Sequence, residues 1–333
     1  YTCASQEYYN SIINWVNRHH NWQIQQEWIT FIPGIVKGIA FVLDCFTSKD
    51  HQIIIQPPVY HPFRIIPTLH HRIVVDNPLT LEAGQYKMDL EGLKNIINPA
   101  SKVLILCNPH NPGGRVWTRQ ELIDIAEICY EHKILVISDE IHSDLAFAPH
   151  KHIPFASVSE KAAQNSITFM APSKTFNIAG IVSSYSIIPN DELRKKFNKY
   201  LESSELDEGH IFAYLAAQIA YEHCDEWLAQ AKDYIWNNIK LVDEYLKANI
   251  PQIKAMTPEA SFLVWLDCRE LNLSQKALVS LFVDDAKLAL NDGEMFGQGG
   301  EGYMRLNVGT PLANIQKALD NLKKAVNAKQ IHD

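Results

Sequence analysis

Long apolar runs are missing from this sequence of 333 residues. No stretch reaches the roughly 18 to 20 consecutive apolar residues that a membrane-spanning helix requires. An excess of positive charge is missing too, because 30 Lys and Arg stand against 38 Asp and Glu and give a formal net charge of -8. Nucleic acids and anionic membranes bind to clustered positive charge, so this balance argues against both and favours a small-molecule ligand.

Paired cysteines and a signal peptide are also missing. The six cysteines are scattered without a CxxC pair, and several lie in apolar segments, as reduced core thiols do. No charged segment followed by an apolar run marks a secretory signal. Together these features predict a reducing, cytoplasmic compartment. Since the chain begins with Tyr1 and not with Met, we expect that a segment precedes it in the natural protein.

The apolar pattern that is present predicts a soluble α/β protein. Hydrophobic residues make up 47% of the chain, which is enough for a large core, and strand-like and helix-like segments alternate. Buried strands are expected at 51–56, 73–75, 103–107, 134–139, 167–170 and 182–188. Helical spacing predicts helices at 35–46, 89–97, 118–132 and 225–246.

Four polar residues follow the ends of four predicted strands: Tyr60, Asn111, Asp139 and Lys174. Parallel strands joined by helices place their carboxyl ends along one edge of a sheet, so we expect these side chains to converge there. Asn111 lies in a turn with two Asn-Pro pairs and Gly-Gly, which would hold its amide as an oriented hydrogen-bond partner. An aromatic ring such as Tyr60 can stack on a flat ligand, although packing at the rim is the commoner role.

Lys174 lies between small residues, directly after the apolar run 167–170. A lysine is seldom fully buried unless it is paired or chemically employed, and a covalent bond to a carbonyl cofactor is one such use. On this stretch alone, a solvated loop lysine is the simpler interpretation.

A Pro33-Gly34 turn leads into the helix expected at 35–46. Backbone N–H groups at a helix start form an anion site, particularly where glycine lets a phosphate approach the main chain. Taken alone, an ordinary loop-to-helix turn explains the same residues. The glycine-rich stretch 297–302 lacks the Lys-Ser/Thr pair of a P-loop, and we interpret it as a flexible loop near the site.

A metal site is an alternative for the segment 139–144. Asp139, His142 and Asp144 are of types that bind zinc or manganese, but we predict that the protein holds no metal. The histidines of 70–71 and 150–152 lie in polar segments, and we expect them to be solvated.

Three motifs in a fixed order carry a family resemblance. They are CNPHNPGGRVWT at 107–118, SDEIHSD at 138–144 and SKTFNIAG at 173–180, with QPPVY at 56–60 upstream and RLN at 305–307 downstream. The chain resembles the pyridoxal-phosphate enzymes of the class I and II aminotransferase family, and within it the cystathionine β-lyases of the MalY/PatB type. The resemblance extends along nearly the whole chain, and the ordered set is far more specific than any one motif.

This resemblance implies the fold type I of pyridoxal-phosphate-dependent transferases. Residues 1–235 would form a large cofactor-binding domain with a mostly parallel sheet flanked by helices, and residues 236–333 a smaller C-terminal α+β domain. It also implies that an N-terminal segment of the small domain, which precedes Tyr1 in the family, is missing from this sequence. A homodimer with shared active sites is implied as well.

Each matching residue acquires an implied role. Lys174 matches the catalytic lysine that bonds covalently to the cofactor, and Asp139 the acid that pairs with its pyridine nitrogen. The other implied cofactor contacts are Gly34, Ile35, Val36 and Ser173 at the phosphate, Asn111 and His142 beside the phenolic oxygen, Tyr60 on the ring, and Tyr1 at the phosphate across the dimer interface. Arg305, together with Asn111, matches the group that binds the substrate α-carboxylate, a planar task that suits guanidinium.

Two positions depart from the family pattern. Many aminotransferases have a serine three residues before the lysine and an arginine eight residues after it, both at the phosphate. Here these positions hold Ala171 and Val182. We therefore expect phosphate binding to depend more on the Gly34 turn, on Ser173 and on the partner chain.

The function implied by the resemblance is that of a carbon–sulfur β-lyase. Such an enzyme uses pyridoxal 5'-phosphate to convert cystathionine or cysteine into a thiol, pyruvate and ammonia. An aminotransferase is the alternative, because the same residues serve both reactions. A non-catalytic regulator that keeps the fold is a third possibility, which the joint presence of Lys174, Asp139, Asn111 and Arg305 argues against.

Overall fold

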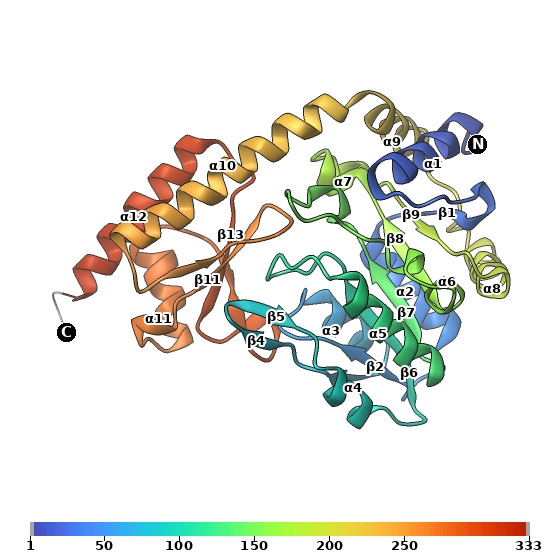
Figure 1. The fold of residues 1–333 in the computed structure, drawn as a ribbon, viewed down its shortest axis with the longest axis horizontal. Helices are drawn as coiled ribbons and strands as arrows, with labels where there is room; N and C mark the ends of the chain where they lie inside the picture. Colours follow the sequence, from blue (N-terminus) through green and yellow to red (C-terminus); the bar gives the residue numbers. More distant parts are fainter. Residues whose placement is uncertain (1–2, 331–333) are drawn as a thin grey trace.

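Two β-sheets organise the chain, and a long helix runs between them (Figure 1). The computed structural model describes residues 3–330. The larger sheet has seven strands, in the spatial order β1 (Ile29–Ile32), β9 (Ser184–Ile187), β8 (Ser166–Met170), β7 (Leu135–Asp139), β6 (Ser101–Cys107), β2 (Gln52–Ile55) and β3 (Ile73–Asp76). The pairs from β8 to β3 are all parallel, whereas β9 is antiparallel to β1 and β8. The strands predicted for this region are confirmed.

Alternate residues of the central strands point into two different cores. On β2, Ile53 and Ile55 pack on one face of the sheet, whereas Ile54 packs on the other. The first face is covered by α2 (Ile35–Phe46), α3 (Pro62–Leu69) and α8 (Asp191–Glu202), and the second by α4 (Leu90–Ile96), α5 (Arg119–Glu131) and α6 (Glu160–Gln164). Because helices cover both faces, β2 and β6 carry continuous apolar runs, at 53–55 and 103–107, instead of alternating with polar residues.

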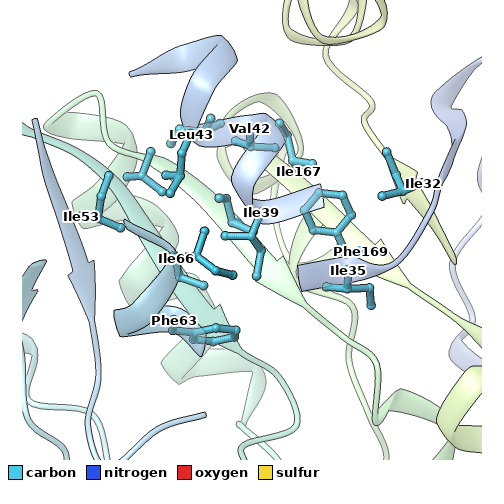
Figure 2. Packing of buried hydrophobic residues seen from close by; sticks show 14 of the residues in the cluster. Ile32, Ile35, Ile39, Val42, Leu43, Ile53, Phe63, Ile66, Ile167 and Phe169 are labelled. Atoms are coloured by element: carbon cyan, nitrogen blue, oxygen red, sulfur yellow. The ribbon is translucent and has the colours of Figure 1, made fainter. Parts of the chain in front are cut away.

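Helix α2 lies close to the sheet because Gly38 has no side chain. Figure 2 shows Ile39 and Val42 of this helix beside Ile167 and Phe169 of β8. A Cβ atom added at Gly38 would come within 2.8 Å of the Phe169 ring. This contact holds the first turns of α2 next to the strand that leads to Lys174.

Two further helices pack together at the β1 edge of the large sheet, α1 (Gln6–His20) and α9 (Ile211–His223) (Figure 1). The Ser5 hydroxyl caps α1 by accepting a hydrogen bond from the Tyr8 amide at 3.3 Å. Tyr8, Trp15 and Tyr221 are among the largest fully buried side chains of this core. Aromatic packing therefore fixes the N-terminal helix to the body of the large sheet.

The smaller sheet is antiparallel and has its own core. Its strands are β10 (Lys254–Met256), β11 (Leu263–Asp267), β13 (Tyr303–Asn307) and β12 (Asn291–Asp292), in that order. The helices that pack with it are α10 (Asp225–Asn249), α11 (Gln275–Ser280) and α12 (Leu312–Gln330). A two-stranded ribbon, β4 (Thr80–Glu82) and β5 (Gln85–Lys87), completes the strands. The large sheet and this one therefore have separate hydrophobic cores.

The predicted division at residues 235 and 236 falls inside α10, which extends from one sheet to the other in Figure 1. The side chains of α10 that join the second core begin at Ile235. The exact boundary stays a prediction. Across residues 3–330, every helix is too short or too polar to span a membrane.

The predicted helix start at Thr118 is confirmed in detail. The Thr118 hydroxyl accepts from the Glu121 amide, and the Glu121 carboxylate accepts from the Thr118 amide at 2.7 Å. This reciprocal cap begins α5 directly after the Asn111 turn.

Candidate active site

The carboxyl ends of β2, β6, β7 and β8 lie at one edge of the large sheet, and the predicted site residues follow them. Asp139 is the last residue of β7, and its Cα pairs with those of Cys107 and Phe169 on the neighbouring strands. Lys174 lies in the one-turn helix α7 (Pro172–Thr175) and not in a loop, directly after β8. Tyr60 is close enough to Asp139 for the two groups to interact electrostatically. The predicted convergence at this edge is therefore present, while the roles of the residues stay predictions.

Asp139 is 4% exposed and accepts one hydrogen bond, from the Ile141 amide at 3.1 Å. Burial, with a smaller contribution from the neighbouring Glu140 carboxylate, raises the pKa of Asp139 to about 7, against the lowering effects of the Ile141 hydrogen bond and the Lys174 charge. Among residues 3–330, no cationic side chain is bonded to this carboxyl group. A buried carboxyl without such a partner fits a ligand that brings a positive charge, such as a protonated ring nitrogen.

His142 faces the same region and is held neutral. Burial lowers its pKa to about 3, and the charges of Lys174 and Arg305 act in the same direction. Its Nδ1 atom is buried without a hydrogen-bond partner in the described part of the chain. The ring of Phe262 lies edge-on to the imidazole at 5.8 Å. A neutral imidazole with an open nitrogen could contact a ligand beside Lys174.

Arg305 on β13 brings the small sheet to this site. Its Nη1 donates to Asn111 Oδ1 and its Nη2 to Asn291 Oδ1, both at 2.7 Å, and its guanidinium lies 4.8 Å from the centre of the Phe296 ring. Burial lowers the pKa of Arg305 to about 10, so it remains charged at neutral pH. Its Nε atom is buried and has no partner within residues 3–330. This oriented cation fits a carboxylate ligand.

Sequence reasoning missed Asn291 and Phe296. Asn291 lies opposite Arg305 in the pairing of β12 with β13. Phe296 ends the short helix 293–296, and its carbonyl accepts from the Val59 amide at 2.9 Å. No short motif surrounds either residue, so only the strand pairing of Asn291 and the guanidinium–ring contact of Phe296 reveal their place beside Arg305.

The Gly34 turn begins α2 with a φ of +108°, a region that favours glycine. The Gly34 amide is already engaged, because it donates to the Ile32 carbonyl and to the Ser184 hydroxyl, each at 2.9 Å. Within the described chain, the amides of Ile35 and Val36 have no such partner, as expected for the first turn of a helix. The turn could therefore hold an anion mainly through these two amides.

The two departures from the family pattern both lie near the turn or the lysine. Val182 takes a left-handed φ of +56°, and its Cγ1 atom would lie 4.0 Å from a Cβ at Gly34. Ala171 is buried directly before α7, whereas Ser173 is only partly buried. Tyr1 lies outside the described residues, so its predicted role is neither supported nor opposed.

A cavity of about 410 Å³ opens beside Lys174 between the two sheets. Its walls include Tyr234 of α10, together with Phe262, Asn307 and Thr310 from the small-sheet side. A ligand attached at Lys174 would have room to extend toward residues of the small domain. Domain-spanning cavities of this size are common ligand sites.

The structure does not bring the candidate metal ligands of the segment 139–144 together as a metal site. The Asp144 carboxylate is occupied by hydrogen bonds from Trp15, His20 and Thr175. Among residues 3–330, no group of three or more His, Cys, Asp or Glu is placed to hold a metal ion.

The expectation that His152 is solvated is wrong. Its side chain is 1% exposed, and its Nε2 lies 2.7 Å from Glu140 Oε2. The polar residues beside it in the sequence, such as the exposed Lys151, conceal this burial.

Residues 2–322 match the family described as aminotransferase class I and II. The chain belongs to this family. Cystathionine beta-lyase PatB of Bacillus subtilis (strain 168) is 40% identical over 327 residues, which are 98% of this chain and 84% of that protein.

Two solved structures of relatives have the same fold as this chain. Cystalysin from Treponema denticola, whose structure contains pyridoxal 5'-phosphate, superposes with a TM-score of 0.96 at 35% identity, over 98% of this chain and 84% of that one. A C-S lyase from Staphylococcus hominis, bound to the same cofactor, gives 0.89 at 30% identity, over 98% and 85%. The predicted fold type I is thereby confirmed.

Proposed function

We propose that this protein is a pyridoxal-phosphate-dependent carbon–sulfur β-lyase that acts on a small sulfur-containing amino acid. The observation that carries the proposal is the 40% identity to a cystathionine beta-lyase over 98% of the chain. Lys174 and Asp139 at one edge of the large sheet, with Arg305 of the small sheet beside them, support it. Products would be a thiol, pyruvate and ammonia, with one water molecule consumed.

The residues present fit this cofactor. Pyridoxal phosphate, when bound, supplies an aldehyde that bonds to a lysine and a ring that withdraws electrons from the substrate Cα. Lys174 would provide the amine, and the buried Asp139 would keep a proton at the ring nitrogen. The open amides of Ile35 and Val36, with Ser173, would hold the phosphate.

The substrate would be oriented by its carboxylate. Arg305 would bind it through the guanidinium, which Asn111 and Asn291 already orient at 2.7 Å. Lys174, released from its bond when the substrate amine replaces it, would take the proton from the substrate Cα. Loss of the thiolate from Cβ would then complete the elimination, because a thiolate is a good leaving group.

Transamination remains the second candidate, since the same proton acceptor could return the proton to the cofactor. The deciding experiment incubates the cofactor-loaded protein with cystathionine or cysteine in the absence of any 2-oxo acid. Release of pyruvate and thiol supports the lyase. Strict dependence on a 2-oxo acid acceptor would instead establish an aminotransferase. If the cofactor-loaded protein shows neither activity, the result would favour a non-catalytic regulator that keeps the fold.

We also propose that the protein forms a homodimer. Helix α9 carries an exposed apolar stripe with Ile211, Leu215 and Ile219 at four-residue intervals and Phe212 beside them, between 44% and 68% exposed. Stripes of this kind on a surface helix are typical of an interface. The family resemblance implies a homodimer, so we propose that a second copy of the chain covers this stripe.

A cytoplasmic location is part of the same proposal. All six cysteines are free thiols, as expected in a reducing compartment.

A further inference from the structure

Helix α7, which carries Lys174, is only one turn long and has little structure of its own. It spans Pro172–Thr175 and has no side-chain cap at Ala171. Its backbone is held by two bonds, from the Phe176 amide to the Pro172 carbonyl and from the Ile178 amide to the Ser173 carbonyl. A single turn is unstable by itself, so its position must come from contacts with the rest of the protein.

Thr175 makes the only side-chain hydrogen bond from α7 to the rest of residues 3–330. Its hydroxyl, on a residue 2% exposed, donates to Asp144 Oδ2 at 2.6 Å. Because Thr175 follows Lys174 directly, this bond fixes the peptide that carries the lysine side chain.

The Asp144 carboxylate is itself anchored by the N-terminal helix. Its Oδ1 atom accepts from Trp15 Nε1 and from His20 Nε2, each at 2.9 Å, and both His20 and Asp144 side chains are nearly fully buried. Burial alone would raise the pKa of Asp144, but the hydrogen bond and charge of His20 and the hydrogen bonds from Thr175 and Trp15 outweigh it and hold the pKa at about 2. The carboxylate is therefore ionised at neutral pH and hydrogen-bonded at both oxygens.

We infer that Asp144 is a positioning residue for Lys174, which it holds through Thr175 while His20 and Trp15 anchor it to α1. This inference rests on the proposed function, in which Lys174 bonds to the cofactor. Among residues 3–330, the hydrogen-bond partners of the Asp144 side chain come from α1 and α7 alone, and its two oxygens are engaged by them. Asp144 would act by holding the lysine in place and not by contacting the substrate.

The competing interpretation is that the network only stabilises the fold. The two differ in what a mutation of Thr175 changes. A stabilising role predicts a general loss of stability, as any buried hydroxyl would give. A positioning role predicts a local loosening of α7 and weaker bonding of the cofactor. The bond from Thr175 to Asp144 should matter, because hydrogen bonds to a charged group are stronger than neutral ones.

The test compares Thr175→Val with Thr175→Ser, which keeps the hydroxyl, and with Thr30→Val as the matched control. The Thr30 hydroxyl is also buried and donates to Asn198 at 2.9 Å, far from α7 in the sequence and on strand β1. Amide hydrogen exchange of the cofactor-free proteins is measured over 172–178. The dissociation constant for pyridoxal phosphate and the thermal midpoint are measured on the same preparations.

We expect Thr175→Val to exchange at least tenfold faster over 172–178 and to bind the cofactor about tenfold more weakly. Thr175→Ser should stay within about twofold of the parent protein in both measurements. Thr30→Val should lower the thermal midpoint by a similar amount without either local effect. Equal exchange and equal affinity in Thr175→Val and the parent would overturn the inference, as would the same local effects in Thr30→Val. If the parent protein itself fails to bind the cofactor, the proposed function fails, and the exchange measurement still decides whether Thr175 holds α7.

Discussion

Arg305 and Asn111 are 194 residues apart in the sequence, yet the guanidinium Nη1 lies 2.7 Å from the amide Oδ1. The bond joins β13 of the small sheet to the turn that follows β6 of the large one. Before any ligand arrives, it orients the guanidinium that we propose binds the substrate carboxylate. The small sheet therefore contributes to the site through an oriented cation and not merely as a cover.

Arg305→Lys should impair substrate binding more than catalysis. A lysine cannot make two bonds in a fixed fork or stack on Phe296 as guanidinium does. We expect the KM for the amino-acid substrate to rise and kcat/KM to fall about tenfold to a hundredfold. Arg269→Lys is the matched control, since Arg269 pairs with Asp267 at 2.7 Å outside the site. Steady-state kinetics measure both, and an unchanged KM in Arg305→Lys would remove this residue from carboxylate binding.

Lys174→Ala should abolish covalent attachment of the cofactor. No hydrogen bond occupies the Lys174 side chain among residues 3–330, so its amine is available for reaction. Parent protein loaded with pyridoxal phosphate and treated with borohydride should gain the reduced cofactor at Lys174, as detected by peptide mass spectrometry. Lys161→Ala, which removes an exposed partner of Glu127, should label like the parent. Labelling at another lysine in place of Lys174 would contradict the assignment.

Much of this site could be predicted from the sequence because its central residues follow directly after buried strands. The rule that parallel strands end at one edge placed Asp139 and Lys174 together, whereas their expected roles came only from the family resemblance. His20 and Asp144 could not be paired in advance, since they lie 124 residues apart and meet only when α1 packs on the large sheet. His152 was assigned to the solvent because its neighbours are polar, whereas its place beside Glu140 depends on tertiary packing.

Glu259 should be important for the stability of the junction between the sheets. Its Oε2 accepts from Arg115 Nη1 at 2.6 Å and from the Val116 amide at 2.7 Å, and its Oε1 accepts from Gln85. Removing one partner of a buried ion pair costs about 3 kcal/mol, because the other charge is left buried. Glu259→Gln should therefore lower the unfolding free energy by about this amount in urea titrations.

The control for that prediction is Glu82→Gln. Glu82 pairs with Lys87 at 2.6 Å on the exposed ribbon β4–β5, with both side chains more than half exposed. Exposed pairs contribute less than about 1 kcal/mol. Equal losses of unfolding free energy in Glu259→Gln and Glu82→Gln would contradict the predicted importance of Glu259 for stability.

The apolar stripe on α9 predicts the oligomeric state. Leu215→Asp places a charge at the centre of the proposed interface, so it should convert the dimer to a monomer in sedimentation velocity experiments. Tyr130→Asp, at an equally exposed aromatic residue on α5, should leave the dimer intact. A parent protein that sediments as a monomer at all concentrations would contradict the proposed homodimer.

Asp139 predicts how the stability of the cofactor-free protein depends on pH. Its folded pKa of about 7 is above the value of about 3.9 expected in an unfolded chain. A raised pKa means that its contribution to stability is fully present below about pH 4 and is lost as the pH rises through about 7. The parent should therefore lose about 2 to 3 kcal/mol relative to Asp139→Asn between pH 5 and pH 8, since the amide cannot ionise.

Urea titrations of both cofactor-free proteins at these two pH values measure the difference. Histidines and carboxylates that do not interact with Asp139 titrate alike in the two variants, so their effects cancel. Asp191→Asn, at an exposed residue on α8, should track the parent. When the cofactor is bound, its protonated ring nitrogen would stabilise the Asp139 carboxylate, and the difference between pH 5 and pH 8 should shrink. A difference that persists unchanged with bound cofactor would mean that Asp139 does not face the ring nitrogen.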